Sequence, residues 1–136
     1  METTKKYVNR ISYEIVGCAV EVHRHLGPGL LESVYEMCMI EEMTACGLQV
    51  LSQVPVQIRY KTKSLDQNLM LDLLVNNLVI VELKAVDVML PVFKAQLLSY
   101  LKLTGKPKGL LINFHCDNIV NNLVPLVTDQ FAKLKD

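Results

Sequence analysis

Asp72, Glu82 and Lys84 form the pattern in this sequence that points most directly to chemistry. Glu82 and Lys84 lie two positions apart in the apolar run 79–84 (Val-Ile-Val-Glu-Leu-Lys), and Asp72 lies inside the apolar run 70–75. Because side chains alternate along a strand, Glu82 and Lys84 share one face. A charge on such an apolar strand is costly unless it is paired or binds a ligand. The alternative is an ordinary ion pair that faces solvent at a strand end.

The length of the loop between the two strands decides whether Asp72 and Glu82 can act together. A two-residue loop at Asn76–Asn77 would place Asp72 opposite Val81 and turn it away from Glu82. A three-residue loop that includes Leu78 would place Asp72 opposite Glu82. Such loops are common, and asparagine tolerates the left-handed backbone that they require. If the two carboxylates work together, we therefore predict the three-residue loop or an equivalent bulge.

Two carboxylates that face each other repel unless a proton or a cation lies between them. Oxygen ligands from two carboxylates, completed by waters and a phosphate, suit Mg²⁺ or Mn²⁺. Lys84 beside them would orient or help to deprotonate an attacking water, or stabilise charge that develops on a phosphoryl oxygen. The three residues therefore predict a metal-dependent site for phosphodiester hydrolysis.

Hydrophobic periodicity predicts the elements that must position these residues. We expect helices over 6–25, 31–46 and 91–103, and strands over 49–60, 69–75, 78–85 and 108–114. Residues 61–68 read as a polar turn, Pro55 as the mark of an edge strand or a bulge, and the tail as a short strand near 119–126 with a closing helix near 128–135. The order ααβββαβ plus a short C-terminal tail predicts an α/β (α+β) fold, with a mixed β-sheet flanked by helices.

Composition restricts the class of protein. The 136 residues fit one domain, 1–136, and the formal net charge is zero. A zero balance argues against a protein that coats nucleic acid by charge alone, but it permits a local basic groove. Residues for such a groove are Arg59, Lys61 and Lys63, with Lys102, Lys106 and Lys108 after the third helix.

The cellular compartment is also suggested by the sequence. No run of about 18 apolar residues is available to span a membrane, and the first residues, Met-Glu-Thr-Thr-Lys-Lys, do not resemble a signal peptide. Four cysteines lack the spacing of a zinc site, so we expect reduced and mostly buried thiols in a cytoplasmic protein.

Asp72 followed by Glu82-Leu83-Lys84 resembles the core of the PD-(D/E)xK nuclease superfamily. Residues 29–35, Gly-Leu-Leu-Glu-Ser-Val-Tyr, resemble the signature of the GxxExxY family within that superfamily. Residues 22–29, 80–85, 95–101 and 109–114 are similar to the same family, so the resemblance covers roughly residues 8–115. One departure is Leu71, which stands where the superfamily name has proline.

The resemblance implies a restriction-endonuclease-like core and a role for each matching residue. Asp72 and Glu82 would bind Mg²⁺ or Mn²⁺ together with the backbone carbonyl of Leu83, and Glu32 would add an acid near the metal. Lys84 would be the catalytic lysine. Gln96 would orient substrate or water, with Tyr100 one turn further on the same helix face. The implied partner is nucleic acid, with DNA favoured over RNA.

Two alternatives remain open from the sequence. One is a catalytically silent module that keeps the nuclease fold and binds nucleic acid or protein. The other is a homodimer whose groove forms only across two subunits, because a chain of 15.4 kDa has little surface to embrace a duplex. Taken singly, Glu32 would serve a helix N-terminus and Gln96 an ordinary helix face. Only their joint occurrence with Asp72, Glu82 and Lys84 favours the nuclease.

Overall fold

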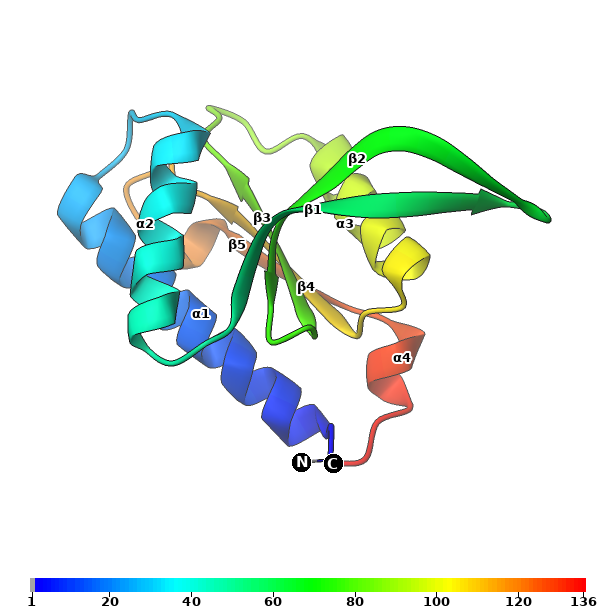
Figure 1. The fold of residues 1–136 in the computed structure, drawn as a ribbon. Coiled ribbons are helices and arrows are strands. Elements are labelled where there is room, and N and C mark those ends of the chain that lie inside the picture. Colours follow the sequence, from blue (N-terminus) through cyan, green and yellow to red (C-terminus); the bar gives the residue numbers. More distant parts are fainter. Residues whose placement is uncertain (1) are drawn as a thin grey trace.

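A five-stranded mixed sheet forms the centre of the computed structural model, which describes residues 2–136 apart from the side chains of 66–68 (Figure 1). The strands follow one another across the sheet in chain order. The first three form an antiparallel meander, the third and fourth are parallel, and the fifth is antiparallel to the fourth. The strands are β1 (Val50–Tyr60), β2 (Lys63–Val75), β3 (Val79–Lys84), β4 (Lys108–Asn113) and β5 (Leu123–Val127).

Helices cover both faces of this sheet, so the predicted mixed α+β fold is confirmed. The first two pack on one face and the third packs on the other, where it connects the parallel strands β3 and β4. A short 3₁₀ helix and a last single-turn helix flank β5. The helices are α1 (Lys5–Leu26), α2 (Glu32–Ala45), α3 (Pro91–Thr104), η1 (Val120–Asn122) and α4 (Asp129–Ala132).

Helix α1 is amphipathic, and local signals define its ends. Its buried residues recur at spacings of three and four, with Ile11, Ile15 and Val22 in the core. Thr4 caps the helix by accepting a hydrogen bond from the Tyr7 amide at 3.0 Å. The following turn contains Gly29 at φ +103°, a backbone conformation that side chains other than glycine rarely adopt. This turn sets the position at which α2 begins.

The first strand lies at the edge of the sheet, as Pro55 predicted. A shift in the β1–β2 register falls between Val56 and Ile58, next to that proline. The predicted polar turn over 61–68 is wrong. Tyr60 pairs with Lys63, so only Lys61 and Thr62 turn, and β2 starts at Lys63. Both faces of this outer part of the hairpin are in solvent over much of its length. Its residues can therefore form strands without the apolar alternation that marks a half-buried strand.

The C-terminal tail contains both predicted elements in shorter form. The 3₁₀ turn η1 takes the place of the start of the predicted strand, and α4 is a single turn. Lys5 donates its backbone N–H to the Lys135 carbonyl at 2.7 Å, which holds the two ends of the chain together (Figure 1). Among the helices described, none is both long enough and apolar enough to cross a bilayer.

All four cysteines are free thiols. Cys18 is buried and Cys46 is exposed, with the other two between these extremes. The prediction of mostly buried thiols is therefore wrong for Cys46, because α2 ends one residue before it and leaves it at the surface.

Candidate active site

The loop between β2 and β3 brings Asp72 and Glu82 together. Val75 pairs with Val79, which leaves three residues in the loop, as the sequence required for a joint site. Asn76 and Asn77 both adopt positive φ, 50° and 56°. The paired register runs back to Leu73 and Val81, so the next pair in that register is Asp72 and Glu82.

Hydrogen bonds accepted by these two side chains connect β2 and β3 beyond the last paired residues. Glu82 Oε2 accepts the backbone N–H of Asp72 at 2.8 Å, and Asp72 Oδ2 accepts the backbone N–H of Leu83 at 2.9 Å. Each carboxylate thus takes the place of a backbone acceptor. These hydrogen bonds fix the two groups beside each other at the end of the β2–β3 ladder.

Burial makes this pair of carboxylates electrostatically costly. Glu82 is only 5% exposed. Burial, followed by the charge of Asp72, raises the pKa of Glu82 to about 8. Burial also raises the pKa of Asp72, while the Leu83 N–H and the Lys84 charge act against that rise. Ionisation of both carboxylates is therefore unfavourable without a bound cation, whose charge would offset theirs.

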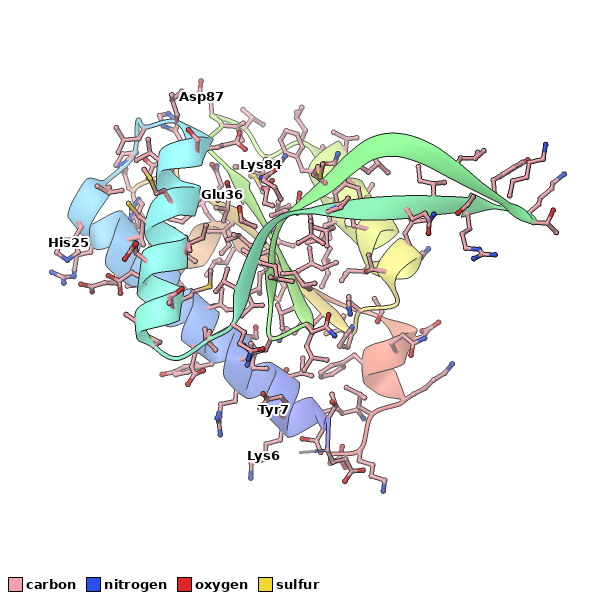
Figure 2. All side chains as sticks on the ribbon, in the orientation of Figure 1. Lys6, Tyr7, His25, Glu36, Lys84 and Asp87 are labelled. Atoms are coloured by element: carbon pink, nitrogen blue, oxygen red, sulfur yellow. The ribbon has the colours of Figure 1, made fainter. Side chains whose placement is uncertain are left out.

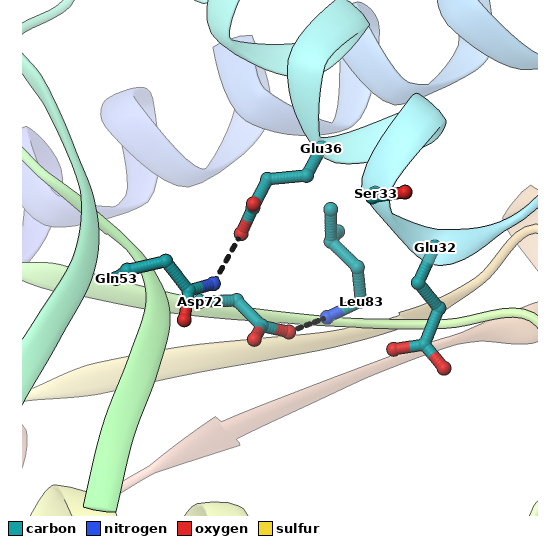
Figure 3. Close-up of a pocket in the computed structure, with 6 residues that line it drawn as sticks. All are labelled: Glu32, Ser33, Glu36, Gln53, Asp72 and Leu83. Carbon is teal, nitrogen blue, oxygen red and sulfur yellow. Dashed lines mark hydrogen bonds between the residues drawn. The ribbon is translucent and has the colours of Figure 1, made fainter.

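The first turn of α2 adds acidic side chains to a cavity over Asp72. The cavity has a volume of about 160 Å³ and is shown in Figure 3. Glu32, the first residue of α2, reaches the cavity as the resemblance implied. The cavity is lined by Glu32, Ser33, Glu36, Gln53, Asp72 and Leu83.

Tyr35 holds the turn that places Glu32. Its side chain is fully buried and stacks on Phe114 with ring centroids 4.4 Å apart. The Tyr35 hydroxyl donates to the Gly27 carbonyl at 2.6 Å and accepts the Leu30 N–H at 3.1 Å. One side chain therefore ties both sides of the Gly-Pro-Gly turn to the helix that follows it. Tyr35 thereby fixes the turn that contains Gly29 and that immediately precedes Glu32.

Glu36 and Gln53 belong to the cavity, although the sequence did not single them out. The Gln53 amide donates to Glu36 Oε1 at 2.8 Å (Figure 3). Gln53 lies opposite Asp72 in the β1–β2 register, and its φ of +52° is unusual for a residue in a strand. Glu36 follows Glu32 by one helical turn, a spacing that places both on one side of α2 and was the available signal. No comparable signal in the sequence marks Gln53.

Lys84 lies at the end of β3 within electrostatic reach of both carboxylates. Its charge lowers the pKa of Asp72 and of Glu82, against the larger effect of burial. The Lys84 Nζ atom is 4.7 Å from the centre of the Phe93 ring, so the first turn of α3 holds it by a cation–π contact. Phe93 is a third residue that the sequence did not identify.

Helix α3 adds Gln96 and Tyr100 from the other face of the sheet. Tyr100 is 6% exposed. Burial raises the pKa of Tyr100, the charges of Glu82 and Asp72 raise it further, and the nearby Gln96 side chain opposes the rise. Gln96 itself is exposed. Gln96 and Tyr100 therefore lie beside each other on α3, and Tyr100 is within electrostatic reach of the carboxylates.

Asn113 fastens the loop that joins Lys84 to α3. It lies opposite Lys84 in the β3–β4 register and is 2% exposed. Its amide exchanges two hydrogen bonds with the backbone of Val86, at 3.1 and 2.9 Å. A buried polar side chain with both ends satisfied in this way rigidifies the segment it holds.

The donor atoms at the site fit a hard divalent cation. The Asp72 and Glu82 carboxylates offer oxygen only, which is the preference of Mg²⁺ and Mn²⁺. The part of the chain that the structure describes contains no group of three or more His, Cys, Asp or Glu side chains already arranged around a metal position. Two carboxylates would therefore need the backbone carbonyl, water or substrate oxygens to complete the coordination.

Comparison with known proteins assigns the chain to a nuclease superfamily. A family model described as the PD-(D/E)XK nuclease superfamily matches residues 9–123, which include every site residue described above. Neither the curated proteins nor the solved structures give a match to the chain.

Proposed function

The chain belongs to the PD-(D/E)XK nuclease superfamily, and on that premise we propose that it hydrolyses nucleic-acid phosphodiester bonds with a divalent cation, Mg²⁺ or Mn²⁺. The observation that carries the proposal is the pairing of Asp72 with Glu82, each accepting a backbone N–H beside Lys84. Within the superfamily, Gly29, Glu32 and Tyr35 favour the GxxExxY family. DNA is the favoured substrate.

Each residue has a distinct task in the proposed reaction. Asp72, Glu82 and the Leu83 carbonyl would hold the cation, which would supply Lewis-acid chemistry by lowering the pKa of water and offsetting charge on phosphate oxygens. Lys84 orients the attacking water and offsets charge on the phosphoryl group. The water oxygen forms a bond to phosphorus while the bond to the leaving oxygen breaks, and the proton that the water loses is balanced by one gained by the leaving oxygen, which departs as a hydroxyl group. Glu32 and Gln96 position substrate or water at the rim.

Nuclease activity is tested with purified protein, Mg²⁺ or Mn²⁺, and duplex or single-stranded DNA and RNA. We expect cleavage of at least one form, and a loss of roughly 10²-fold or more in Lys84→Ala, the range for losing one positioned catalytic group. Lys133→Ala, an exposed lysine beyond α4, is the matched control and should cleave normally. Undiminished cleavage by a folded Lys84→Ala protein would contradict the role of this lysine.

Metal binding is tested separately by calorimetry with Mn²⁺. We expect the wild-type protein to bind Mn²⁺ and Asp72→Asn to lose that binding, because a neutral amide is a poor ligand for a hard cation. Asp117→Asn, which changes an exposed aspartate, is the control. Equal affinity in the wild-type and Asp72→Asn proteins would remove Asp72 from the metal site.

A catalytically silent module is the second candidate. The observation in its favour is that the described residues contain no preformed group of three metal-binding side chains. Nucleic-acid binding without Mn²⁺ binding and without cleavage would support this candidate over the nuclease.

A homodimer and a cytoplasmic location complete the proposal. The strand β1 lies at the sheet edge and carries the exposed side chain of Leu51, which a second copy could cover. Sedimentation at several protein concentrations measures this directly. The four free thiols suit a reducing compartment.

A further inference from the structure

The outer part of the β1–β2 hairpin, residues 54–70, is a prominent feature of the fold that the proposed function leaves unused. We call this segment the arm. Figure 1 shows it projecting well past the rest of the sheet. Its base is anchored, because Val54, Val56 and Leu69 pack in the cluster under α3. Beyond that base the two strands stay paired as far as Tyr60 and Lys63, with exposed side chains from 59 to 65.

The tip of the arm is cationic. Arg59, Lys61 and Lys63 are all exposed there, and nitrogen-tipped side chains gather at the free end in Figure 2. The Lys61 Nζ atom lies 5.5 Å from the centre of the Tyr60 ring, which is itself 60% exposed. The chain as a whole has no net charge, whereas the arm sequence has these three cations and one acid, Asp66.

These cations stand apart from the acidic groups that the structure describes. No ion pair in the described part of the chain involves Arg59, Lys61 or Lys63. Three exposed cations on a projecting ribbon, with no ion pair among the described side chains, form a surface suited to the phosphate groups of a polyanion. A two-stranded ribbon alone gains little stability from its own contacts, so the arm is costly to keep without a partner.

The arm is rooted at the candidate active site. Gln53 and Asp72 lie opposite each other at its base. Lys63 is nine residues along β2 from Asp72 and Arg59 is six residues along β1 from Gln53, so the tip lies roughly 20–30 Å away at about 3.3 Å per residue. The cations therefore cannot touch the phosphate at the carboxylates. In a nucleic acid, phosphates of one strand at that distance are about six to nine nucleotides away.

We propose that the arm binds the phosphate backbone of a nucleic-acid polymer, through Arg59, Lys61 and Lys63, while a distant phosphate of the same molecule occupies the site at Asp72 and Glu82. The inference rests on the proposed function and adds the requirement that the substrate exceed a minimum length. A substrate shorter than the reach of the arm cannot occupy both places. Affinity therefore increases with substrate length, and the arm supplies that increase.

The test compares two variants with the same loss of charge, both in a Lys84→Ala background that blocks cleavage. The arm variant combines Arg59→Gln, Lys61→Gln and Lys63→Gln. The control variant combines Lys6→Gln, Arg10→Gln and Lys133→Gln, and Figure 2 shows Lys6 at the opposite end of the molecule from Lys84. Binding of labelled duplex DNA and duplex RNA, each of about 4, 12 and 24 base pairs, is measured with Mg²⁺ at several salt concentrations.

We expect the arm variant to bind the longer duplexes of at least one polymer about tenfold more weakly than the control variant, with a salt dependence lower by about 2–3 ions released. The difference between the variants should shrink at the shortest length. The polymer that shows this pattern is the one that the arm binds. Equal affinity and equal salt dependence of the two variants at all lengths would overturn the inference.

A parallel assay of the wild-type protein separates this inference from the proposed function. If the wild-type protein cleaves nucleic acid but the two variants bind alike, the inference alone fails. If the wild-type protein neither cleaves nor binds, the proposed function fails with it. Sedimentation of the arm variant is the third measurement. Dissociation of a wild-type dimer by the arm substitutions, without a length-dependent change in binding, would assign the arm to contact between two copies and overturn the inference.

Discussion

At the scale of single residues, the candidate site brings two acidic side chains together, and burial and mutual repulsion make it costly to ionise both of them. The half-buried Asp72 and the buried Glu82 lie side by side, and each accepts a backbone N–H of the neighbouring strand. Those hydrogen bonds reduce the cost of burying the two groups, but ionisation of both remains costly. A cation would remove the remaining cost, so the same geometry that weakens the metal-free protein prepares it to bind metal.

The raised pKa of Glu82 predicts how the stability of the metal-free protein changes with pH. An unfolded chain loses this proton near pH 4.5, but the folded chain keeps it until about pH 8. Between these values the folded state binds more protons than the unfolded state. The contribution of Glu82 to stability is therefore fully present at low pH and is lost as the pH rises. We expect the free energy of unfolding in EDTA to fall between these pH values, by up to about 1.4 kcal/mol per pH unit.

Glu82→Gln is the control for that prediction. The amide has no proton to lose, so the variant should lack this part of the pH dependence and should be more stable than the wild-type protein at about pH 8 without metal. Urea unfolding at several pH values measures the difference between the two proteins. A parallel pH dependence in both proteins would show that other groups cause it.

Gln53 carries backbone strain that can be measured by a pair of substitutions. Glycine normally destabilises a strand relative to alanine, but the φ of +52° at this position favours glycine. We therefore expect Gln53→Gly to be more stable than Gln53→Ala by about 1 kcal/mol, although both lose the contact with Glu36. Thermal or urea unfolding gives the comparison. The usual order, with alanine more stable, would contradict the strained conformation.

At the scale of elements, the turn between α1 and α2 decides where Glu32 lies. Tyr35→Phe would leave the Leu30 N–H and the Gly27 carbonyl without their buried partner while the aromatic ring still stacks on Phe114. We expect a loss of about 1–3 kcal/mol in the free energy of unfolding. We also expect weaker cleavage, because the turn no longer holds the start of α2. Tyr13→Phe, at a side chain that is 79% exposed, should change neither property.

The contact between α3 and β4 depends on Gly109. A methyl group at this position would lie 2.9 Å from a Leu97 methyl carbon, closer than side chains tolerate. Gly109→Ala should therefore cost about 1–3 kcal/mol and shift the helix that carries Gln96. Gly17 in α1 is the matched control, since an added methyl group meets no atom within 4 Å. Gly17→Ala should be neutral or stabilise by up to about 1 kcal/mol, as measured by urea unfolding.

At the scale of the whole molecule, the sheet lies between two hydrophobic cores, and residues from both of its faces contribute to the site. One core lies under α1 and α2, and the other lies under α3. Glu32 and Glu36 approach the carboxylates from the first side, and Lys84, Gln96 and Tyr100 contribute from the α3 side. The site therefore depends on both layers and on the point at which the β2–β3 ladder ends.

The sequence alone predicted the helices and strands of the core, because burial requires apolar residues to recur along each of them with the period of a helix or a strand. The predicted helix over 91–103 corresponds to Pro91–Thr104, and the predicted strand over 108–114 to Lys108–Asn113. Elements that are not buried lack this apolar periodicity. For this reason the outer part of β2, from Lys63, was interpreted as a turn.

The sequence also identified Asp72, Glu82 and Lys84 as candidates, because charges in apolar strands are unusual whatever their surroundings. It left the loop length open, since both registers kept an alternating pattern. Pairing across the sheet chose the three-residue loop and placed the two carboxylates side by side. Glu36, Gln53 and Phe93 joined them only through contacts between segments far apart in the chain. Such contacts depend on packing between elements, which local periodicity does not encode.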